Sequence, residues 1–397
     1  MTKTIHPFPA RMAPELALAS LQKLQPGSII LDPMAGSGTV LRQATDLGLK
    51  AIGFDVDPLS VLMAGVWTTP IDLEKLDALF DEILRQISTL DGNLVTLPWI
   101  DDDVETSNFV GYWFGDSQRA TLRSLAFVLY NLDASADAKQ KRTAEANVLR
   151  VSLSRIIVTK EMCASLARDT SHSRPHRVAL ESNYDVLEGF ERSFRALRKR
   201  ISESPARGAA RIDLGDARKL TAIDDSSIDA ILTSPPYLNA IDYLRGHRLA
   251  LVWLGWRCSE IRAIRTDSIG TERGLKTAPS TKAFIDTKTA CGDVAALPPS
   301  YNRMIDRYVM DLVKMTREAS RVMRRGAVAT FVVGNSCLRG VFISNANSVA
   351  AAATHASLEE TSRYERELPQ RSRYLPLSDG ALSKRMRTET ILTFVKR

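Results

Sequence analysis

The sequence lacks any apolar run long enough to cross a bilayer. Its longest apolar stretch, residues 327–333, is interrupted by Thr330 and is far shorter than the roughly 20 residues that a membrane-spanning helix needs. The first twelve residues, MTKTIHPFPARM, have neither the basic-then-apolar pattern nor the small-residue cleavage site of a secretory signal. The sequence therefore predicts a cytoplasmic protein with no membrane segment.

Metal-binding and disulfide patterns are also missing. The four cysteines are scattered and form no C-x-x-C pair, which excludes a disulfide framework and a zinc ribbon. The histidines show no metal spacing, and the acidic run 101–103 has no further ligands at a useful distance along the chain. We therefore expect no metal site.

What the chain does contain is an average globular composition. Apolar residues make up 44% and charged residues 25% of the 397 positions, which excludes collagen-like, disordered and coiled-coil classes. Lys and Arg (53) exceed Asp and Glu (46) by 7, a modest basic excess. That balance allows a polyanionic partner without requiring one.

The first part of the chain, residues 1–70, alternates short apolar runs with helical periodicity. Two buried strands are predicted at 28–32 and 51–55, and two helices at 38–47 and 58–68. This order is the beginning of an α/β domain.

Residues 71–209 contain helical patterns and no strand signals of comparable strength. Eleven acids and two bases lie in 72–116, whereas thirteen bases and seven acids lie in 150–211, including the dense basic run 192–200. We predict a mostly helical insertion with separated charge, a candidate region for recognition of a target. The basic run is equally compatible with a solvated helix face.

Strand signals resume in residues 210–397. Strands are predicted at 210–215, 228–233 and 327–333, with a long amphipathic helix from 301 before the last of these. Two more strands, 357–366 and 388–396, have no helix between them and therefore predict an antiparallel pair. The Thr-, Ser- and Gly-rich stretch 257–300 shows no clear periodicity and is predicted to be a long flexible loop.

A glycine turn, LDPMAGSGTVL, joins the first strand to the first helix. Gly36 and Gly38 lack the third glycine of a dinucleotide fingerprint and the lysine of a P-loop. Asp32 would repel pyrophosphate but suits a ligand with an ammonium and a sulfonium, such as S-adenosylmethionine, while Asp55 can accept both ribose hydroxyls. An alternative is a glycine turn whose aspartates only cap helices.

A second motif, TSPPY, directly follows the strand 228–233. Pro235 and Pro236 fix the backbone and remove two N–H donors. The Ser234 hydroxyl and the Pro235 carbonyl can accept hydrogen bonds from an amino group, and Tyr237 offers a ring on which a base can stack. By itself, the motif is also compatible with a Pro-Pro turn at a strand end.

Together these motifs resemble the amino DNA methyltransferases, the enzymes that methylate cytosine-N4 or adenine-N6. The cofactor loop of that family is similar to Asp32, Pro33, Met34, Ala35, Gly36, Ser37, Gly38 and Thr39, although Met34 stands where the family usually has an aromatic residue. The catalytic motif of the family is similar to Ser234, Pro235, Pro236 and Tyr237.

Two weaker similarities extend the expected cofactor site. The stretch that begins at His6 resembles one that borders the methionine end of the cofactor, which implies contacts from Phe8, Pro9, Ala10 and Arg11. Asp216, after the third strand, resembles an acid that family members place near the adenine amino group. His6 and Arg11 could instead be surface residues, and Asp216 an ordinary loop acid.

The resemblance implies a Rossmann-like class I methyltransferase fold. Its mostly parallel seven-stranded sheet would carry a terminal antiparallel hairpin and a helical insertion. Residues 1–70 would form the cofactor-binding part, 71–209 the insertion and 210–397 the catalytic part.

The resemblance also implies an activity and its partners. S-adenosylmethionine would be the cofactor, double-stranded DNA the substrate, and a restriction or defence component a possible companion. The serine before Pro-Pro favours cytosine-N4 over adenine-N6, and the absence of a cysteine in this loop argues against carbon-5 methylation. An RNA base amino-methyltransferase and an inactive DNA-binding subunit remain alternatives.

Overall fold

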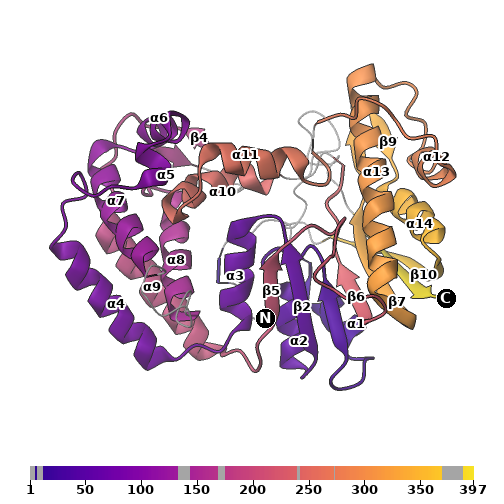
Figure 1. The fold of residues 1–397 in the computed structure, drawn as a ribbon, viewed down its shortest axis with the longest axis horizontal. Coiled ribbons are helices and arrows are strands. Elements are labelled where there is room, and N and C mark those ends of the chain that lie inside the picture. The colour runs from indigo at the N-terminus through magenta and orange to yellow at the C-terminus, as the bar shows by residue number, and fades with distance from the viewer. Residues whose placement is uncertain are drawn as a thin grey trace. The chain divides into compact units, whose positions relative to one another are not determined.

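The computed structural model describes residues 5–6, 12–132, 144–168, 175–238, 242–271, 273–368 and 388–397 (Figure 1). The chain forms two compact units. The sheet unit comprises residues 10–56, 210–241 and 266–397, and the helical unit comprises 1–9, 57–209 and 242–265.

The sheet unit is built on seven strands in the order β10-β11-β7-β6-β1-β2-β5. These strands are β1 Ile29–Asp32, β2 Lys50–Asp55, β5 Arg211–Leu214, β6 Ile228–Thr233, β7 Met323–Gly334, β10 Leu358–Glu367 and β11 Thr388–Lys396. Strand β11 runs antiparallel to both of its neighbours, whereas the pairings among β5, β2, β1, β6 and β7 are all parallel. The predicted α/β fold, with its terminal antiparallel hairpin, is confirmed.

Helices of the sheet unit include α1 Pro14–Leu21, α2 Thr39–Asp46, α13 Pro299–Val322 and α14 Asn345–His355. The predicted amphipathic helix is α13, whose residues Ile305, Leu312 and Met315 are buried in one core cluster with Phe331 of β7. Helix α14 had no clear signal in the sequence, because its alanines, serine and asparagines form no apolar stripe. A small hairpin, β8 Ser336–Leu338 and β9 Val341–Ile343, precedes it.

The prediction of a long loop at 257–300 is wrong in part. This stretch contains α11 Cys258–Asp267 and α12 Lys282–Thr289. Each helix is short and buries only two residues, Cys258 and Ile261 in α11, and Phe284 and Thr287 in α12. Such a narrow buried face leaves too few apolar positions to produce a recognisable period.

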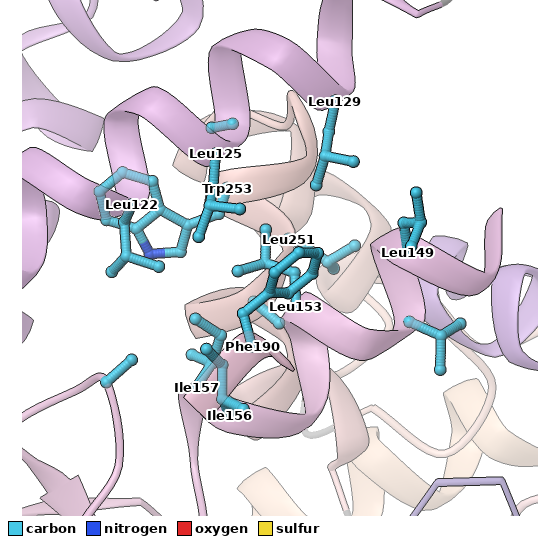
Figure 2. Close-up of a cluster of buried hydrophobic side chains, with 14 of the residues drawn as sticks. Leu122, Leu125, Leu129, Leu149, Leu153, Ile156, Ile157, Phe190, Leu251 and Trp253 are labelled. Atoms are coloured by element: carbon cyan, nitrogen blue, oxygen red, sulfur yellow. The ribbon is translucent and has the colours of Figure 1, made fainter. Parts of the chain in front are cut away.

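The helical unit packs its helices around an extensive apolar core. Its elements are α3 Pro58–Thr68, α4 Leu73–Ser88, α5 Pro98–Asp101, α6 Val104–Trp113, α7 Asp116–Asn131, α8 Ala144–Ile157, α9 Val186–Glu203, α10 Tyr243–Leu251, a 3-10 turn Val252–Leu254, and the two-residue strands β3 Ala167–Arg168 and β4 His176–Arg177. Figure 2 shows part of the core, including Leu125 and Leu129 of α7, Leu149 and Leu153 of α8, and Phe190 of α9.

The boundaries of the helical unit differ from the predicted insertion at 71–209. Helix α3 belongs to this unit, and so do α10 and most of α11, which follow the TSPPY motif. Leu59 and Met63 of α3, together with Trp253, are buried in its core. Local patterns could not assign these helices, because an amphipathic helix does not indicate which core it will cover. Among the described residues, no helix has the length and hydropathy of a membrane span.

Candidate active site

The candidate site lies in the sheet unit, where neighbouring parallel strands end at one edge. Strand β1 ends at Asp32, β2 at Asp55 and β6 at Thr233. In the register of the sheet, Asp32 pairs with Gly53 of β2 and Thr233 pairs with Phe331 of β7. Ligands of open α/β sheets bind at this carboxyl edge, so both sequence motifs converge on the expected location.

Asp32 is the most buried carboxylate among the predicted cofactor residues, with 3% of its surface exposed. The Thr233 hydroxyl donates to its Oδ1 at 2.7 Å, and the Met34 N–H donates to the same oxygen at 3.2 Å. Burial raises the pKa of Asp32 to about 7, although both hydrogen bonds act in the opposite direction. The nearby Asp55 carboxylate adds to the increase in this pKa. A cationic ligand would relieve this cost.

The glycine turn has the backbone that its sequence requires. Gly36 and Gly38 have φ values of 50° and 84°, a left-handed region that side chains disfavour. The Gly36 N–H donates to Asp55 Oδ2 at 2.8 Å, which fixes the turn against the end of β2. No side chain caps α2 at Gly38, so its first N–H groups are open to an acceptor from a ligand.

The loop also holds buried polar atoms without partners. The hydroxyl oxygens of Ser37 and Thr39 are buried and form no hydrogen bond with any residue that the structure describes. Such orphaned groups are costly in a folded protein, and a bound ligand or water is one explanation for them. With two carboxylates, two orphaned hydroxyls and an uncapped helix, the residues present fit a cofactor that has a cationic end, a carboxylate and a ribose.

The TSPPY loop directs its serine toward the sheet. The Ser234 hydroxyl donates its hydrogen to the Val332 carbonyl of β7 at 3.0 Å. Because this bond uses the only hydrogen of the hydroxyl, the lone pairs of Ser234 Oγ remain available as acceptors. Pro235 is buried, and neither it nor Pro236 carries an N–H, as expected for a rigid frame of carbonyl acceptors.

Tyr237 is largely buried at the base of this loop. Its hydroxyl lies 3.5 Å from Oε1 of Glu389, the second residue of β11. Burial raises the pKa of the Glu389 carboxyl. The fully buried Tyr308 of α13 is a further phenol in this core, and burial raises its pKa well above the ordinary value.

Asp216 is engaged in an ion-pair network. Its carboxylate accepts from the Arg218 guanidinium, with 2.5 Å between Oδ2 and Nη2, and from the Arg218 N–H at 2.8 Å. Arg218 also donates to the buried Asp311 at 2.8 Å and to Asp267 at 3.0 Å. These bonds give Asp216 a structural partner, and its predicted contact with the cofactor stays a prediction.

Other predicted residues are distributed as follows. Phe8, Pro9, Ala10 and Arg11 lie outside the described residues, and His6 is buried in the part of the chain that clusters with the helical unit. Met34 is half-buried against the core of the sheet unit. In the described part of the chain, no group of three or more His, Cys, Asp or Glu side chains could hold a metal ion.

Three residues of the site had no assigned role in the sequence. Thr233 belongs to the quoted motif, but its bond to Asp32 depends on the pairing of β6 with β1. Glu389 reaches Tyr237 only because β11 pairs with β7. Gly270 approaches the TSPPY loop closely, since a methyl group built on it would lie 3.0 Å from the Tyr237 carbonyl oxygen. Only the first of these had a local signal.

The sheet unit has the Rossmann-like α/β fold that the sequence predicts, and the residues at the carboxyl edge of its sheet fit S-adenosylmethionine. Residues 3–64, which include the glycine turn and β2, match the family model described as DNA methylase, for enzymes of the N6 and N4 type. Over these residues the chain is similar to the family of amino DNA methyltransferases.

Three Type II methyltransferases are similar to the chain. M.MjaII of Methanocaldococcus jannaschii is 34% identical over 91 residues, or 23% of this chain and 17% of the relative. M.BsoBI of Geobacillus stearothermophilus is 26% identical over 61% of this chain and 50% of the relative, and M.MvaI of Kocuria varians is 23% identical over 86% and 79%. The chain therefore spans half or less of the length of the first two relatives and about four fifths of the third.

Proposed function

We propose that this protein is a site-specific DNA methyltransferase that methylates the exocyclic amine of a base, with cytosine-N4 preferred to adenine-N6. The observation that carries the proposal is the Ser234 hydroxyl, whose hydrogen is donated to Val332 while its lone pairs stay available beside the cofactor loop. The family match and the similarity to three Type II methyltransferases support DNA as the substrate.

The amine of a nucleobase is a poor nucleophile, because its lone pair is conjugated into the ring. Ser234 Oγ and the Pro235 carbonyl accept hydrogen bonds from this amine, and these bonds strengthen as positive charge develops on the nitrogen. Tyr237 supplies the ring on which a base flipped out of the duplex stacks. Bound S-adenosylmethionine supplies an electrophilic methyl group.

The cofactor end of the site is held by other residues. Asp32 and the Asp55 carboxylate take the cationic end and the ribose, and the hydroxyls of Ser37 and Thr39 supply further hydrogen bonds. Thr233 donates to Asp32 and so keeps that carboxylate facing the cofactor rather than the amine. Neighbouring residues Thr233 and Ser234 thus serve the two different reactants.

Cytosine is favoured by the serine before Pro-Pro. In the family that the TSPPY motif resembles, a serine before Pro-Pro, such as Ser234, is typical of cytosine-N4 methylation. Aspartate or asparagine at that position is typical of adenine-N6 methylation. A hydroxyl, a carboxamide and a carboxylate can all accept from an NH₂ group, so the preference is chemical rather than absolute. Target recognition is assigned to the helical unit, and a cognate restriction or defence component is the expected companion.

The test is nucleoside mass spectrometry of DNA from a methylation-free host that expresses the protein. We expect N4-methylcytosine, and N6-methyladenine alone would overturn the preference for cytosine. The absence of both from DNA, with a methylated base in RNA, would instead support the RNA base methyltransferase.

The matched variant is Ser234→Ala. It should lower turnover by about 100-fold or more, the usual effect of removing one group that stabilises developing charge. Cofactor affinity, measured by calorimetry, should be unchanged. A variant that retains full turnover would exclude Ser234 as the acceptor of the amine.

A further inference from the structure

A short stretch of the sheet unit, residues 268–271 and 273–276, lies against both the TSPPY loop and helix α13. Gly270, at a φ of 78°, is close to the Tyr237 carbonyl oxygen, and a methyl group on Gly274 would lie 2.6 Å from Cβ of Arg303. The Leu275 N–H donates to the Arg303 carbonyl at 3.0 Å. The stretch therefore runs from the TSPPY loop, which Gly270 contacts, to the first turns of α13, which Gly274 and Leu275 contact.

Four exposed cations lie on this stretch, near the start of α13 and at the β8–β9 turn that contacts α13. Arg273 and Lys276 flank Gly274 and Leu275, Arg303 lies near the start of α13, and Arg339 lies at the turn between β8 and β9. The Arg339 guanidinium stands over the Tyr301 ring at 5.2 Å, two residues before Arg303 on α13. We name these four residues the basic surface.

The basic surface differs from the basic run on helix α9 in its lack of acidic partners. Within the described residues, none of its four cations forms an ion pair with a carboxylate. In contrast, Arg192 and Arg195 of the predicted basic run pair with Glu188 and Glu191 one helical turn away. Helix α9 thus neutralises much of its own charge.

The same contrast holds inside the stretch 257–300. Arg262 pairs with Glu105, Arg265 with Asp242, and Lys288 with Asp306. Within the described residues, the other basic side chains of this stretch, Arg257, Arg273, Lys276 and Lys282, form no ion pair with a carboxylate. Arg273 and Lys276 follow closely after Gly270, which lies against the TSPPY loop. Exposed cations without acidic partners are the groups that bind a phosphate backbone.

We propose that the basic surface binds the phosphates that flank the target base in DNA. Contacts with phosphates carry no sequence information but fix the register of the duplex on the protein. By holding the backbone beside Tyr237, they would present one nucleotide to the TSPPY loop. This inference rests on the proposed function and adds the contact surface of its polyanionic substrate.

The test measures how DNA affinity depends on salt. A duplex of about 30 base pairs and arbitrary sequence serves as the probe, since phosphate contacts do not depend on sequence. In the variant Arg273→Gln, Lys276→Gln, Arg303→Gln, Arg339→Gln, the slope of log affinity against log salt should decrease by about 0.9 for each phosphate that the protein no longer neutralises, or about 3 to 4 in all.

The matched control is Arg192→Gln, Arg195→Gln, which removes two cations that already have partners on α9 and should leave the slope nearly unchanged. Calorimetric binding of S-adenosylmethionine verifies that each variant is folded. Unchanged slope in the variant of the basic surface, with DNA binding and methylation retained, would overturn this inference alone. A wild-type protein that neither binds nor methylates DNA would instead overturn the proposed function.

Discussion

The helical unit and the sheet unit treat their buried polar groups differently. In the helical unit, the Gln118 side-chain amide donates to the carbonyls of Ser182 and Tyr184, and the Arg150 guanidinium donates to that of Leu129. Such bonds join loops and helices within one core. Among its described side chains, Trp253 Nε1 and Arg248 Nε are buried exceptions, and Arg248 lies over the Phe109 ring at 5.0 Å.

In the described part of the sheet unit, two of the buried polar atoms without partners belong to the glycine turn after β1, and others lie on α12, α13 and α14. Ser37 and Thr39 are buried without partners among the described residues, and Asp32 carries a pKa of about 7 because its charge is poorly compensated. A folded protein can tolerate a few such unfavourable groups when the rest of its core is well packed. The comparison teaches that the candidate site places orphaned hydroxyls on the same loop as a carboxyl whose pKa burial raises.

The largest expected effect distinguishes the cores of the two units. Phe190 is fully buried in the helical unit, so Phe190→Ala should lower the free energy of unfolding by about 3 to 5 kcal/mol. All five tryptophans, Trp67, Trp99, Trp113, Trp253 and Trp256, lie in that unit, so a urea titration followed by tryptophan fluorescence reports on it.

Leu180→Ala is the control for this prediction. Leu180 is 81% exposed in the same unit, and its loss should change the free energy of unfolding by less than about 0.5 kcal/mol. Cofactor affinity of the folded Phe190→Ala protein should equal that of the wild type. A large loss of cofactor affinity would show that the core of the helical unit also affects the cofactor site of the sheet unit.

The second effect follows from the raised pKa of Asp32. Below pH 7 the carboxyl is protonated in the free protein, and a cationic cofactor must displace that proton, so affinity should fall by up to about tenfold per pH unit as the pH is lowered from 7. Above pH 7 the affinity should level off. Calorimetry between about pH 5.5 and pH 8 measures this dependence, because the two limits lie about one unit or more on either side of the pKa of Asp32.

Asp32→Asn is the matched variant for the pH dependence. It cannot ionise, so its weaker affinity should be nearly independent of pH over the same window. The same shift affects the free energy of unfolding. Because folding raises the pKa of Asp32, ionisation of this carboxyl lowers the free energy of unfolding as the pH rises from about 4 to 7. The Asp32→Asn variant should not show this decrease. If wild type and variant show the same pH dependence, Asp32 does not control it.

A smaller effect separates the two neighbouring hydroxyls. Thr233→Val removes the hydrogen bond that favours ionised Asp32 and should weaken cofactor binding by about 1 to 2 kcal/mol. Turnover at saturating cofactor should change little, in contrast to Ser234→Ala. Steady-state kinetics with varied cofactor concentration tests both variants. If both variants lose cofactor affinity and turnover to the same extent, the two hydroxyls do not have separate roles.

The smallest expected effect concerns Glu389. Its contact with the Tyr237 hydroxyl is long, at 3.5 Å, so Glu389→Ala should lower turnover only by the cost of one weak hydrogen bond, about 0.5 to 1.5 kcal/mol. Glu389→Gln keeps a hydrogen-bond acceptor, so this variant should retain most of the wild-type turnover. A double-mutant cycle with Tyr237→Phe measures the coupling, and additive losses would show that the two residues act independently.

Much of the fold followed from local patterns. The strands β1, β2, β6 and β11 lie within about one residue of their predicted bounds, because short runs of apolar and β-branched residues between turn signals favour strands. The two loops at the sheet edge were equally visible, since Gly36, Gly38 and the proline pair have backbone requirements that few other residues meet.

The features that local patterns could not assign depend on contacts between residues that lie far apart in the sequence. The helices α11, α12 and α14 bury narrow faces and produce no clear period, and α3 and α10 gave no sign of which core they would join. Charge runs were equally ambiguous, since Arg192 and Arg195 proved to be paired within their own helix.

The sequence alone determined the chemistry of the two loops and the order of the strands that carry them, because backbone preference and periodicity act over a few neighbouring residues. Only the tertiary structure decided that Thr233 bonds to Asp32, that Ser234 turns its hydrogen toward Val332, and that Glu389 reaches Tyr237. These contacts join residues about 100 to 200 positions apart, and their geometry depends on which strands become neighbours in the sheet.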